Sequence, residues 1–471
     1  MALLLLGLFL PALQLKFKIF DEQELKGSYR KREKIPFTVQ AWSDAAFQDS
    51  LTGWMNDKMG FRPFMVRLRN QLLWFSDKKT FVKNVVVGKQ NYLYEQAYID
   101  AYLGRDVKSK EQVEAICRRL KLAQDSLAQS GIPLLVVLAP GKASFFPEYL
   151  PQQYDGVKSG LTNYDLFSAA LQQQKINTID FRKWFLNQKE KSKYPLYPSA
   201  GIHWSNYGSW LVMDSLIRFY EDYFKSDLIS LIMSEPVFSD TLQSPDNDIL
   251  EAMNLLNPPS YTRMAYPRVS WEDASGKVKP RLYAVGDSYF WQLFNNGFSQ
   301  IVFSDTRFNY YSRKEYLMTQ GGALVEKDFS ADEFSLTSTH TQLEAKIRNS
   351  KEMMKMIEKK ALQKGIPVDS MIRLDAQWLL ERERNAVLFV VTEANLKDFP
   401  WGFDRRLEEI LNLNGVKKNR QQAIEEYEKK IRSSPEMMKM METKAKQRGI
   451  GLDSMIRMDA RWLLDEELKS E

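Results

Sequence analysis

Hydrophobic positions in the first part of the chain recur at helical spacing. Residues 38–77 place apolar side chains on one face, and residues 60–63, which include a glycine and a proline, interrupt the pattern. The part after this break predicts a helix over about 64–75, with apolar side chains from Met65 to Phe75 at helical spacing. We expect this helical segment to pack on the main domain or to lie near a membrane.

From residue 84 onward, short apolar runs alternate with helical patterns. The predicted strands are 84–87, 132–138, 176–179, 282–285, 300–303 and 387–391, and the clearest helices are 110–130, 205–224 and 403–412. Continuously apolar strands are typical of a sheet that is buried on both faces, and their alternation with helices predicts a parallel α/β sheet sandwiched by helices. Residues 235–280 are rich in Pro, Asn, Asp and Ser, which predicts a long loop excursion of the kind that shapes a cleft.

The end of the chain repeats an earlier segment. Residues 347–383 match residues 431–467 at a fixed offset of 84 (347 to 431), with about two thirds of the positions identical. Each copy predicts a helical hairpin with a glycine at its turn. Both copies carry recurring methionines, which favour a packing surface and leave a role in binding a partner open: these are Met353, Met354, Met356, Met437, Met438 and Met440.

These patterns divide the chain into successive parts. We expect a signal or membrane anchor at 1–20, a helical segment at 21–109, an α/β domain at 110–338 that continues at 385–415, an inserted helical hairpin at 339–384 and a second hairpin at 416–471. The segment Ala2–Leu13 is almost wholly apolar but shorter than the roughly 20 residues that span a bilayer. It fits the apolar core of a secretory signal or part of an anchor, and it predicts export.

Composition excludes several classes of protein. The formal net charge of +6 is small for 471 residues, and basic and acidic residues are interleaved, so no nucleic-acid partner is indicated. Cys117 is the only cysteine and the chain has two histidines, so there is no internal disulfide and we expect no metal site. Nothing in the sequence implies a cofactor.

Two short motifs carry the candidate chemistry. Gly286, Asp287, Ser288 and Tyr289 directly follow the predicted strand 282–285, which places the serine on a turn at the carboxyl edge of the sheet, where open α/β sheets bind ligands. A second motif, His203-Trp204, precedes Ser205, which stands where the N-cap of a helix belongs. A serine hydroxyl needs a neighbouring base to become a nucleophile, and histidine is the side chain best suited to that near neutral pH. The sequence therefore predicts one site formed by Ser288 and His203.

These motifs resemble those of the SGNH-hydrolase-like family of the alginate O-acetyltransferases and related exopolysaccharide-modifying proteins. The resemblance covers about residues 1–310 and the strand near 387–391, and it is carried by the apolar start, Gly60-Phe61-Arg62, Pro140–Ser144, Pro147–Pro151, Ile179-Asp180-Phe181, His203-Trp204-Ser205 with Gly208, and Gly286–Tyr289. It implies that Ser288 carries a transient acetyl group and that His203 acts as base and then as acid. It also implies an oxyanion hole that includes the Ser288 backbone N–H, with Asp287 fixing the turn and Gly286 and Tyr289 beside it.

The sequence departs from the family pattern at one position. The family usually has Asp-x-His-Trp, in which the aspartate orients the histidine, whereas here the residue two before His203 is Gly201. Three explanations stay open at this stage. Another carboxylate (Asp180, Asp248 or Glu148) takes over the role, a backbone carbonyl orients the ring, or the domain no longer catalyses.

The remaining candidates concern substrate and partners. Residues predicted to line a binding cleft are Lys142, Trp204, Arg307, Asn309 and Tyr310. The resemblance implies an exported O-acetyltransferase or acetylesterase acting on a cell-envelope polysaccharide, periplasmic and held at the inner membrane by its N-terminus. It also implies a multi-span membrane acyltransferase as the source of the acetyl group. The alternative is a catalytically degenerate polysaccharide-binding or assembly subunit on the same fold.

Overall fold

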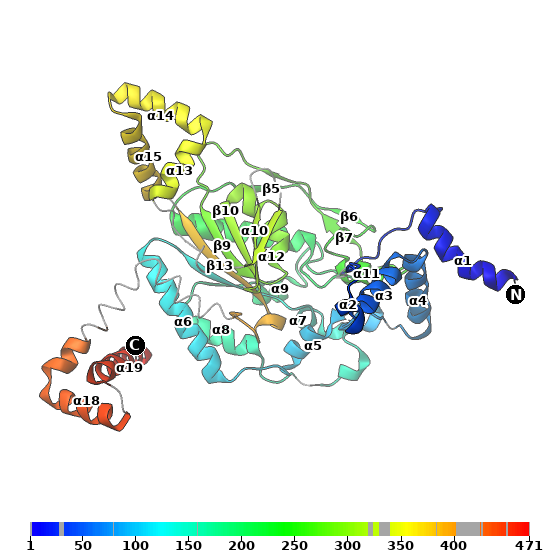
Figure 1. The fold of residues 1–471 in the computed structure, drawn as a ribbon, viewed down its shortest axis with the longest axis horizontal. Helices are drawn as coiled ribbons and strands as arrows, with labels where there is room; N and C mark the ends of the chain where they lie inside the picture. Colours follow the sequence, from blue (N-terminus) through cyan, green and yellow to red (C-terminus); the bar gives the residue numbers. More distant parts are fainter. Residues whose placement is uncertain are drawn as a thin grey trace.

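The structure is a computed structural model, drawn in Figure 1. The residues that it describes are 2–27, 33–78, 80–157, 159–318, 324–328, 340–382, 384–401, 424, 427–448 and 451–470. The predicted helix at 403–412 lies outside these residues.

A seven-stranded sheet forms the centre of the molecule (Figure 1). In spatial order its strands are β12 (Leu324–Asp328), β11 (Lys314–Met318), β10 (Ser304–Tyr310), β9 (Arg281–Gly286), β13 (Asn385–Thr392), β3 (Leu134–Ala139) and β4 (Thr178–Asp180). The five strands from β10 to β4 are parallel, and β11 and β12 extend the β10 edge in antiparallel register. All parallel strands therefore end at the same edge of the sheet.

Helices cover both faces of this sheet. Alternate residues of β3 belong to different apolar cores: Leu135 and Val137 pack with one cluster, and Leu134 and Val136 with the other. The first cluster includes α9 (Phe181–Gln188), α10 (Asn206–Phe224) and α12 (Phe290–Asn295), and the second includes α6 (Lys110–Gln129) and α8 (Asn163–Gln173). The predicted α/β class, a parallel sheet sandwiched by helices, is confirmed.

One predicted strand is wrong. Residues Phe298–Val302 form a π-helical turn (η4), and the strand β10 begins only at Ser304. The run that suggested a strand at 300–303 is apolar because Val302 and Phe303 are buried in the core, and a short apolar run does not by itself distinguish a buried helical turn from a strand.

The predicted loop excursion at 235–280 contains small elements of its own. Four short strands, which lie within this excursion or just before it, form two antiparallel pairs. These are β5 (Leu231–Met233) with β8 (Val269–Trp271), and β6 (Val237–Ser239) with β7 (Met264–Tyr266). Between β6 and β7 lies the single-turn helix α11 (Asp248–Met253). This excursion supplies a residue of the site described below.

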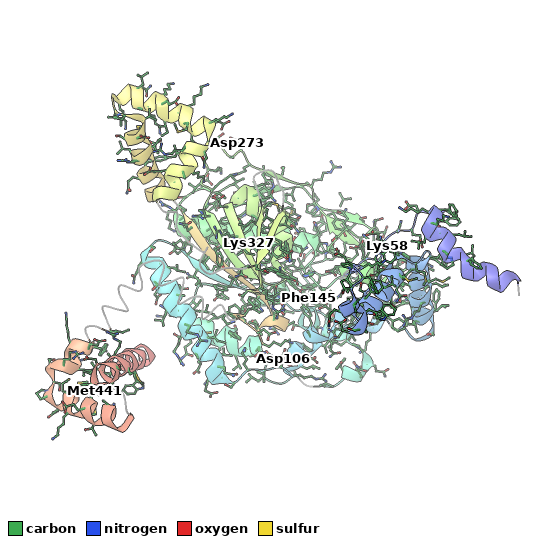
Figure 2. The ribbon with its side chains drawn as sticks, in the orientation of Figure 1. Lys58, Asp106, Phe145, Asp273, Lys327 and Met441 are labelled. Atoms are coloured by element: carbon green, nitrogen blue, oxygen red, sulfur yellow. The ribbon has the colours of Figure 1, made fainter. Side chains whose placement is uncertain are left out.

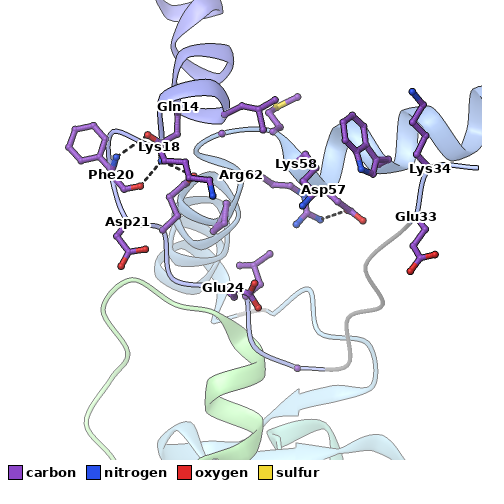
Figure 3. A pocket seen from close by; sticks show the side chains of 18 residues that line it. Gln14, Lys18, Phe20, Asp21, Glu24, Glu33, Lys34, Asp57, Lys58 and Arg62 are labelled. Atoms are coloured by element: carbon purple, nitrogen blue, oxygen red, sulfur yellow. Dashed lines mark hydrogen bonds and ion pairs between the residues drawn. The ribbon is translucent and has the colours of Figure 1, made fainter.

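The N-terminal part is helical, with α1 (Ala2–Phe17), α2 (Val39–Ser43), α3 (Ala46–Lys58) and α4 (Arg62–Asp77). Gly60 allows α1 to pack at the break between α3 and α4, because a Cβ at this position would lie 2.4 Å from the carbonyl oxygen of Pro11. The Gln14 side chain is hydrogen-bonded to the backbone of Phe20, and Arg62 is paired with Asp57 (Figure 3). None of the helices in the described ranges is both long enough and apolar enough to cross a membrane.

Helix α4 packs on the domain through the buried Trp74, which joins the main apolar core, and through polar side chains beside it. The amide of Asn70 donates to the carbonyl of Met253 (2.8 Å), and the buried Gln71 accepts from the backbone N–H of Asn257 (2.8 Å). The predicted apolar face, which includes Met65 and Phe75, is instead exposed. The helix therefore contacts the domain as one expectation had it, but through Asn70, Gln71 and Trp74 rather than through the predicted apolar face.

Three short elements follow α4 along the chain: β1 (Val85–Val87), β2 (Leu93–Glu95) and α5 (Gln96–Leu103). Another short helix, α7 (Lys142–Phe145), comes directly after β3. Strands β1 and β2 are antiparallel. Their buried residues join the same core as α10 and α12.

The repeated segments form two similar helical units. The first contains α13 (His340–Asn349), α14 (Lys351–Lys364) and α15 (Val368–Arg382), and the second contains α18 (Pro435–Arg448) and α19 (Leu452–Ser470). Their cores use equivalent positions, such as Ala376 and Ala460, and the ion pair Lys360–Asp375 recurs as Lys444–Asp459. Figure 2 shows Met441, a core residue of the second unit, well away from the central sheet.

The recurring methionines divide between these cores and the surface. Met353, Met354, Met437 and Met438 pack against the cores, whereas Met356 and Met440 are exposed. Packing therefore accounts for four of these six side chains.

Candidate active site

Ser288 lies on the turn that connects β9 to α12, at the carboxyl edge of the sheet. Its side chain is half-buried. In the described part of the chain the Ser288 backbone N–H has no acceptor, so this donor is available to a ligand.

Asp287 is fully buried and holds this turn. One carboxylate oxygen accepts from the backbone N–H and hydroxyl of Thr392 (both 2.8 Å) and from the amide of Asn395 (2.9 Å). The other accepts from the N–H of Tyr289 (3.1 Å). Burial raises the pKa of Asp287 and these hydrogen bonds oppose that rise. Asp287 thereby ties the turn to the end of the neighbouring strand β13 and has no direct contact with His203 or with the Ser288 hydroxyl among these bonds.

His203 comes from a different part of the chain. The Ser205 hydroxyl accepts from the N–H of Gly208 (2.9 Å) and so caps α10, which leaves His203 in the loop just before the helix. Its Nε2 lies 2.8 Å from the Ser288 Oγ, a hydrogen-bond distance between residues 85 positions apart. The structure therefore brings together the two side chains on which the sequence prediction depends.

Asp248 orients the histidine ring. Its Oδ2 lies 2.5 Å from Nδ1 of His203, and its Oδ1 accepts from the backbone N–H of Ile202 (3.0 Å). For Nε2 to accept the serine proton, Nδ1 must carry the ring hydrogen and donate it to Asp248. Of the three explanations left open by the sequence, the geometry favours a substitute carboxylate, with Asp248 at the position that such a carboxylate would take.

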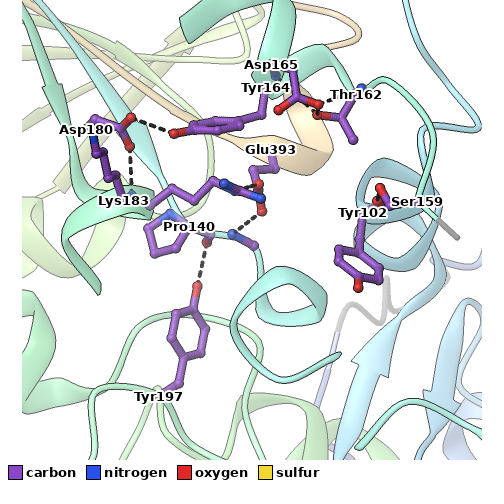
Figure 4. A network of polar contacts seen from close by, with 12 residues as sticks. Tyr102, Pro140, Ser159, Thr162, Tyr164, Asp165, Asp180, Lys183, Tyr197 and Glu393 are labelled. Carbon is purple, nitrogen blue, oxygen red and sulfur yellow. Dashed lines mark hydrogen bonds and ion pairs between the residues drawn. The ribbon is translucent and has the colours of Figure 1, made fainter. Parts of the chain in front are cut away.

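The other two candidate acids lie elsewhere. Asp180 caps α9 through the N–H of Lys183 (2.9 Å) and accepts from the hydroxyl of Tyr164 (2.7 Å), as Figure 4 shows. Glu148 is paired with Lys189 (2.6 Å). Neither is bonded to the histidine, so the expectation that Asp180 orients the ring is not supported.

Gly201 leaves space for the segment that delivers Asp248. A Cβ at position 201 would lie 2.7 Å from the carbonyl oxygen of Pro245 and 2.9 Å from that of Asp246. Backbone atoms at these distances cannot move aside as a flexible side chain can. Glycine at position 201, where the family usually has the acid, is therefore what allows the segment that carries Asp248 to pack beside the histidine loop.

Nearby charges raise the pKa of His203. Burial alone lowers the pKa of the ring, but the Asp248 carboxylate stabilises the imidazolium by charge and by hydrogen bonding, with smaller contributions from Asp287 and Glu95, and the net shift is upward. Glu95, at the end of β2, has its own pKa raised by burial. The ring is thus a stronger base than an ordinary histidine.

Tyr289 links the serine turn to the histidine loop. Its buried hydroxyl donates to the carbonyl of Ile202 (2.8 Å), and it lies 2.5 Å from the hydroxyl of Tyr197. Tyr197 in turn contacts the carbonyl of Pro140 at the end of β3 (2.6 Å; Figure 4). Tyr289, which follows Ser288, therefore holds Ile202, which precedes His203.

Lys142 does not face a cleft. Its side chain is fully buried, and its Nζ donates to the carbonyls of Ser199 (2.9 Å) and Gly201 (2.5 Å). Burial lowers the pKa of Lys142 to about 7. The prediction of an exposed substrate-binding lysine is wrong, because the loop that carries His203 folds over this side chain and uses it as a hydrogen-bond donor.

Two other predicted cleft residues are also buried. Trp204 is fully buried and packs against Phe185 and Tyr289. Asn309 is buried and donates to the hydroxyl of Tyr283 (3.0 Å), which belongs to the opposite core of the sheet. Neither can touch a substrate in this structure, so both predictions are wrong.

Arg307 and Tyr310 differ in position although both belong to β10. Arg307 lies two residues before Asn309 on the strand, so both side chains point to the same face of the sheet. Arg307 is also paired with Glu315 of β11 (3.9 Å). Tyr310 is half-buried at the carboxyl end of the strand, in register with Gly286. Of the predicted binding residues, only Tyr310 lies at the same edge and on the same face as the serine turn.

Among the described residues, no group of three or more His, Cys, Asp or Glu side chains could hold a metal ion.

Several residues of the site were missed by the sequence prediction. Thr392 is the last residue of β13 and Asn395 lies three residues further on, and their position at the end of an apolar strand is a weak signal for the same sheet edge. Tyr197 had no signal, because its role depends on a contact with Tyr289 across 92 positions.

A serine at the carboxyl edge of a parallel sheet, with a histidine 2.8 Å away and a carboxylate behind the ring, is the arrangement that serine-dependent acyl-transferring enzymes use. Residues 85–228 match the sequence model of a family described as the SGNH hydrolase-like domain, acetyltransferase AlgX. The matched segment includes His203 but ends before Asp248 and Ser288. The resemblance and the SGNH-hydrolase-like fold are thereby confirmed. No curated protein matches the chain.

Several solved structures are also similar. The O-acetyltransferase domain of Pseudomonas putida AlgJ is 17% identical, with 70% of this chain and 99% of that chain covered and a TM-score of 0.39. Pseudomonas aeruginosa AlgX is 16% identical, with 69% of each chain covered and a TM-score of 0.35. Bacillus cereus PatB1 is 11% identical, with 66% of this chain and 96% of that chain covered and a TM-score of 0.33.

Proposed function

We propose that this protein is an exported O-acetyltransferase, or acetylesterase, that modifies a cell-envelope polysaccharide through an acetyl-serine intermediate. The observation that carries the proposal is the 2.8 Å distance between Ser288 Oγ and His203 Nε2. The acetyltransferase description of the matched family supports the choice of acyl group.

In the first half of the reaction, the Ser288 oxygen attacks the carbonyl carbon of an acetyl donor. His203 Nε2 takes the hydroxyl proton and Asp248 stabilises the resulting imidazolium. The carbonyl oxygen becomes an oxyanion, for which the Ser288 backbone N–H is a donor. The bond to the donor's leaving oxygen then breaks, and His203 returns its proton to that oxygen.

In the second half, the acceptor attacks the acetyl-serine. A sugar hydroxyl gives its proton to His203 and forms the new ester, and His203 then protonates the released Ser288 oxygen. Water in place of the sugar gives acetate, so transferase and esterase differ only in the acceptor. The degenerate-subunit alternative rests on Gly201 and on the helical repeats, and the contact between Asp248 and His203 supports the enzyme over this alternative.

Export, a periplasmic location and an N-terminal attachment to the inner membrane are part of the proposal. They are supported by the apolar segment Ala2–Leu13 and by the family resemblance. A multi-span membrane acyltransferase is the proposed source of the acetyl group, because an acetyl donor at the outer face has to come from the cytoplasm.

The experiment is a comparison of the purified chain with its Ser288→Ala variant on an acetyl-ester reporter. We expect acetate release and, under acid quench, a mass increase of one acetyl group on the peptide that contains Ser288. Release by S288A at the rate of the parent would contradict the proposal. The location is tested separately by fusing alkaline phosphatase, which is active only outside the cytoplasm, after residue 471.

A further inference from the structure

Helix α4 differs from an ordinary surface helix, because most of the side chains that it turns toward the domain are polar. Its domain-facing side carries Arg67, Asn70 and Gln71 beside the buried Trp74. Arg67 donates to the carbonyls of Gln23 (2.9 Å) and Glu24 (2.8 Å). The polar residues are therefore the ones already occupied by protein contacts.

The outward side of α4 is apolar. Phe64, Met65, Leu72 and Phe75 are 45%, 58%, 60% and 65% exposed. At 100° per residue these four side chains fall within about 100° of one another, which is the width of an ordinary buried stripe. A stripe of this size normally faces a core, so leaving it in water is unfavourable unless something covers it.

The surroundings of the stripe indicate what covers it. Helices α2 and α3 expose Trp42, Met55 and, just after α3, Met59, and α1 exposes Phe9 and Phe17. Residues 1–83 contain fourteen Lys and Arg against eight Asp and Glu, so this segment alone accounts for the net charge of +6 of the whole chain. Within α4 the only acid is Asp77, at its end. Helices that combine an apolar face with basic flanks bind anionic membrane surfaces.

We propose that the outward stripe of α4, formed by Phe64, Met65, Leu72 and Phe75, docks on an anionic phospholipid bilayer. The helix lies in the plane of the interface with these side chains among the upper acyl chains. Arg69, which is exposed and stacks over Phe81 at 3.5 Å, lies at the level of the headgroups. This surface is distinct from any anchor supplied by α1, and it does not depend on the proposed chemistry at Ser288.

Docking through α4 would also place the catalytic machinery near the lipid. The inner face of α4 contacts the end of α11, whose first residue is Asp248. The active-site acid is therefore separated from the docked surface by the diameter of α4, roughly 10 Å, together with the length of α11, about 8 Å at 1.5 Å per residue. An acetyl donor carried by a membrane protein would have a short path to the site.

The test is the environment of a fluorophore on the stripe. Variants of the full chain with one introduced cysteine, Leu72→Cys or Phe75→Cys, are labelled with NBD, and Leu122→Cys, an exposed apolar position on α6, is the matched control. The native Cys117 is buried, and burial raises its pKa to about 12, so its thiol stays unlabelled. Each protein is mixed with phosphatidylcholine vesicles with or without phosphatidylglycerol.

We expect a blue shift of NBD emission, and quenching by doxyl-labelled lipid, at positions 72 and 75 with the anionic vesicles but not at position 122. Added salt should weaken the effect, because the charge attraction is screened. Labels at 72 and 75 that stay in water, whether the chain is bound through α1 or unbound, would overturn the proposal. If the NBD emission instead shifted to the blue as the protein concentration rose in the absence of vesicles, the stripe would be covered by a second copy of this chain and not by lipid. Far-UV circular dichroism spectra and thermal unfolding midpoints equal to those of the parent check that the variants are folded.

Discussion

The backbone of Asp246 occupies the space in which a side chain at position 201 would stand. Its carbonyl oxygen would lie 2.9 Å from a Cβ there, and that of Pro245 would lie 2.7 Å away. Two residues further on, Asp248 reaches the ring of His203. The orienting acid and the glycine therefore require each other in this chain.

We predict that Gly201→Ala lowers both stability and turnover. The added methyl group forces the backbone at 245–246 away, which costs about 1–3 kcal/mol of unfolding free energy as in other overpacked cores. The same displacement moves Asp248 from His203. Urea unfolding and reporter kinetics measure the two effects, and an alanine variant with parental values of both would show that the close approach is not real. Gly160→Ala is the control for the loss of a glycine, since a Cβ at that position would meet only the carbonyl oxygen of Leu103, at 3.7 Å, which is an ordinary van der Waals distance.

Asp248 and Asp180, two of the three candidate acids, give a matched pair of variants. We predict that Asp248→Asn lowers kcat by about 10²–10⁴-fold, because an amide holds the ring in the wrong tautomer and does not stabilise the imidazolium. Asp180→Asn keeps the cap of α9 in shape and should change kcat less than threefold. Steady-state kinetics on the acetyl-ester reporter distinguish the two. A larger effect at position 180 than at 248 would reverse the assignment.

The raised pKa of His203 predicts the direction of the pH dependence. Nε2 must be unprotonated to take the serine proton, so kcat/KM should rise with pH and level off above the pKa of the ring, at a higher pH than an ordinary histidine would give. Removing the carboxylate in Asp248→Asn leaves burial, which lowers the pKa, so the residual activity should level off at a lower pH. If kcat/KM of Asp248→Asn levelled off at a higher pH than that of the parent, the Asp248 carboxylate would not be the group that raises the pKa of His203.

Tyr289 is predicted to be a positioning residue. Tyr289→Phe removes the hydrogen bond to the carbonyl of Ile202 and should cost about 1 kcal/mol of stability. Because Ile202 precedes His203, we also expect kcat to fall roughly 10-fold with KM nearly unchanged. Tyr220→Phe is the control, since the hydroxyl of this buried tyrosine has no partner in the part of the chain that the structure describes. A fall in stability without a fall in kcat would leave Tyr289 with a structural role only.

Much of the fold and part of the site could be predicted because their causes are local. The apolar strand that ends at Gly286 and the cap at Ser205 are each contained in a few neighbouring residues, and together they place Ser288 and His203. Where local pattern was ambiguous the prediction failed, as at 300–303, since an apolar run is compatible with either a strand or a buried helical turn.

Some features of the protein depend on contacts between distant segments, and only the tertiary structure decided them. Asp248 reaches His203 across 45 positions, by a path through the 235–280 excursion that no periodicity encodes. Lys142 is buried because the loop around Ser199 closes over it. The stripe of α4 faces outward because Asn70 and Gln71 bind α11 and the segment after it. In each case, the sequence by itself determined the element and its chemistry, whereas its partner was selected by the packing of the whole chain.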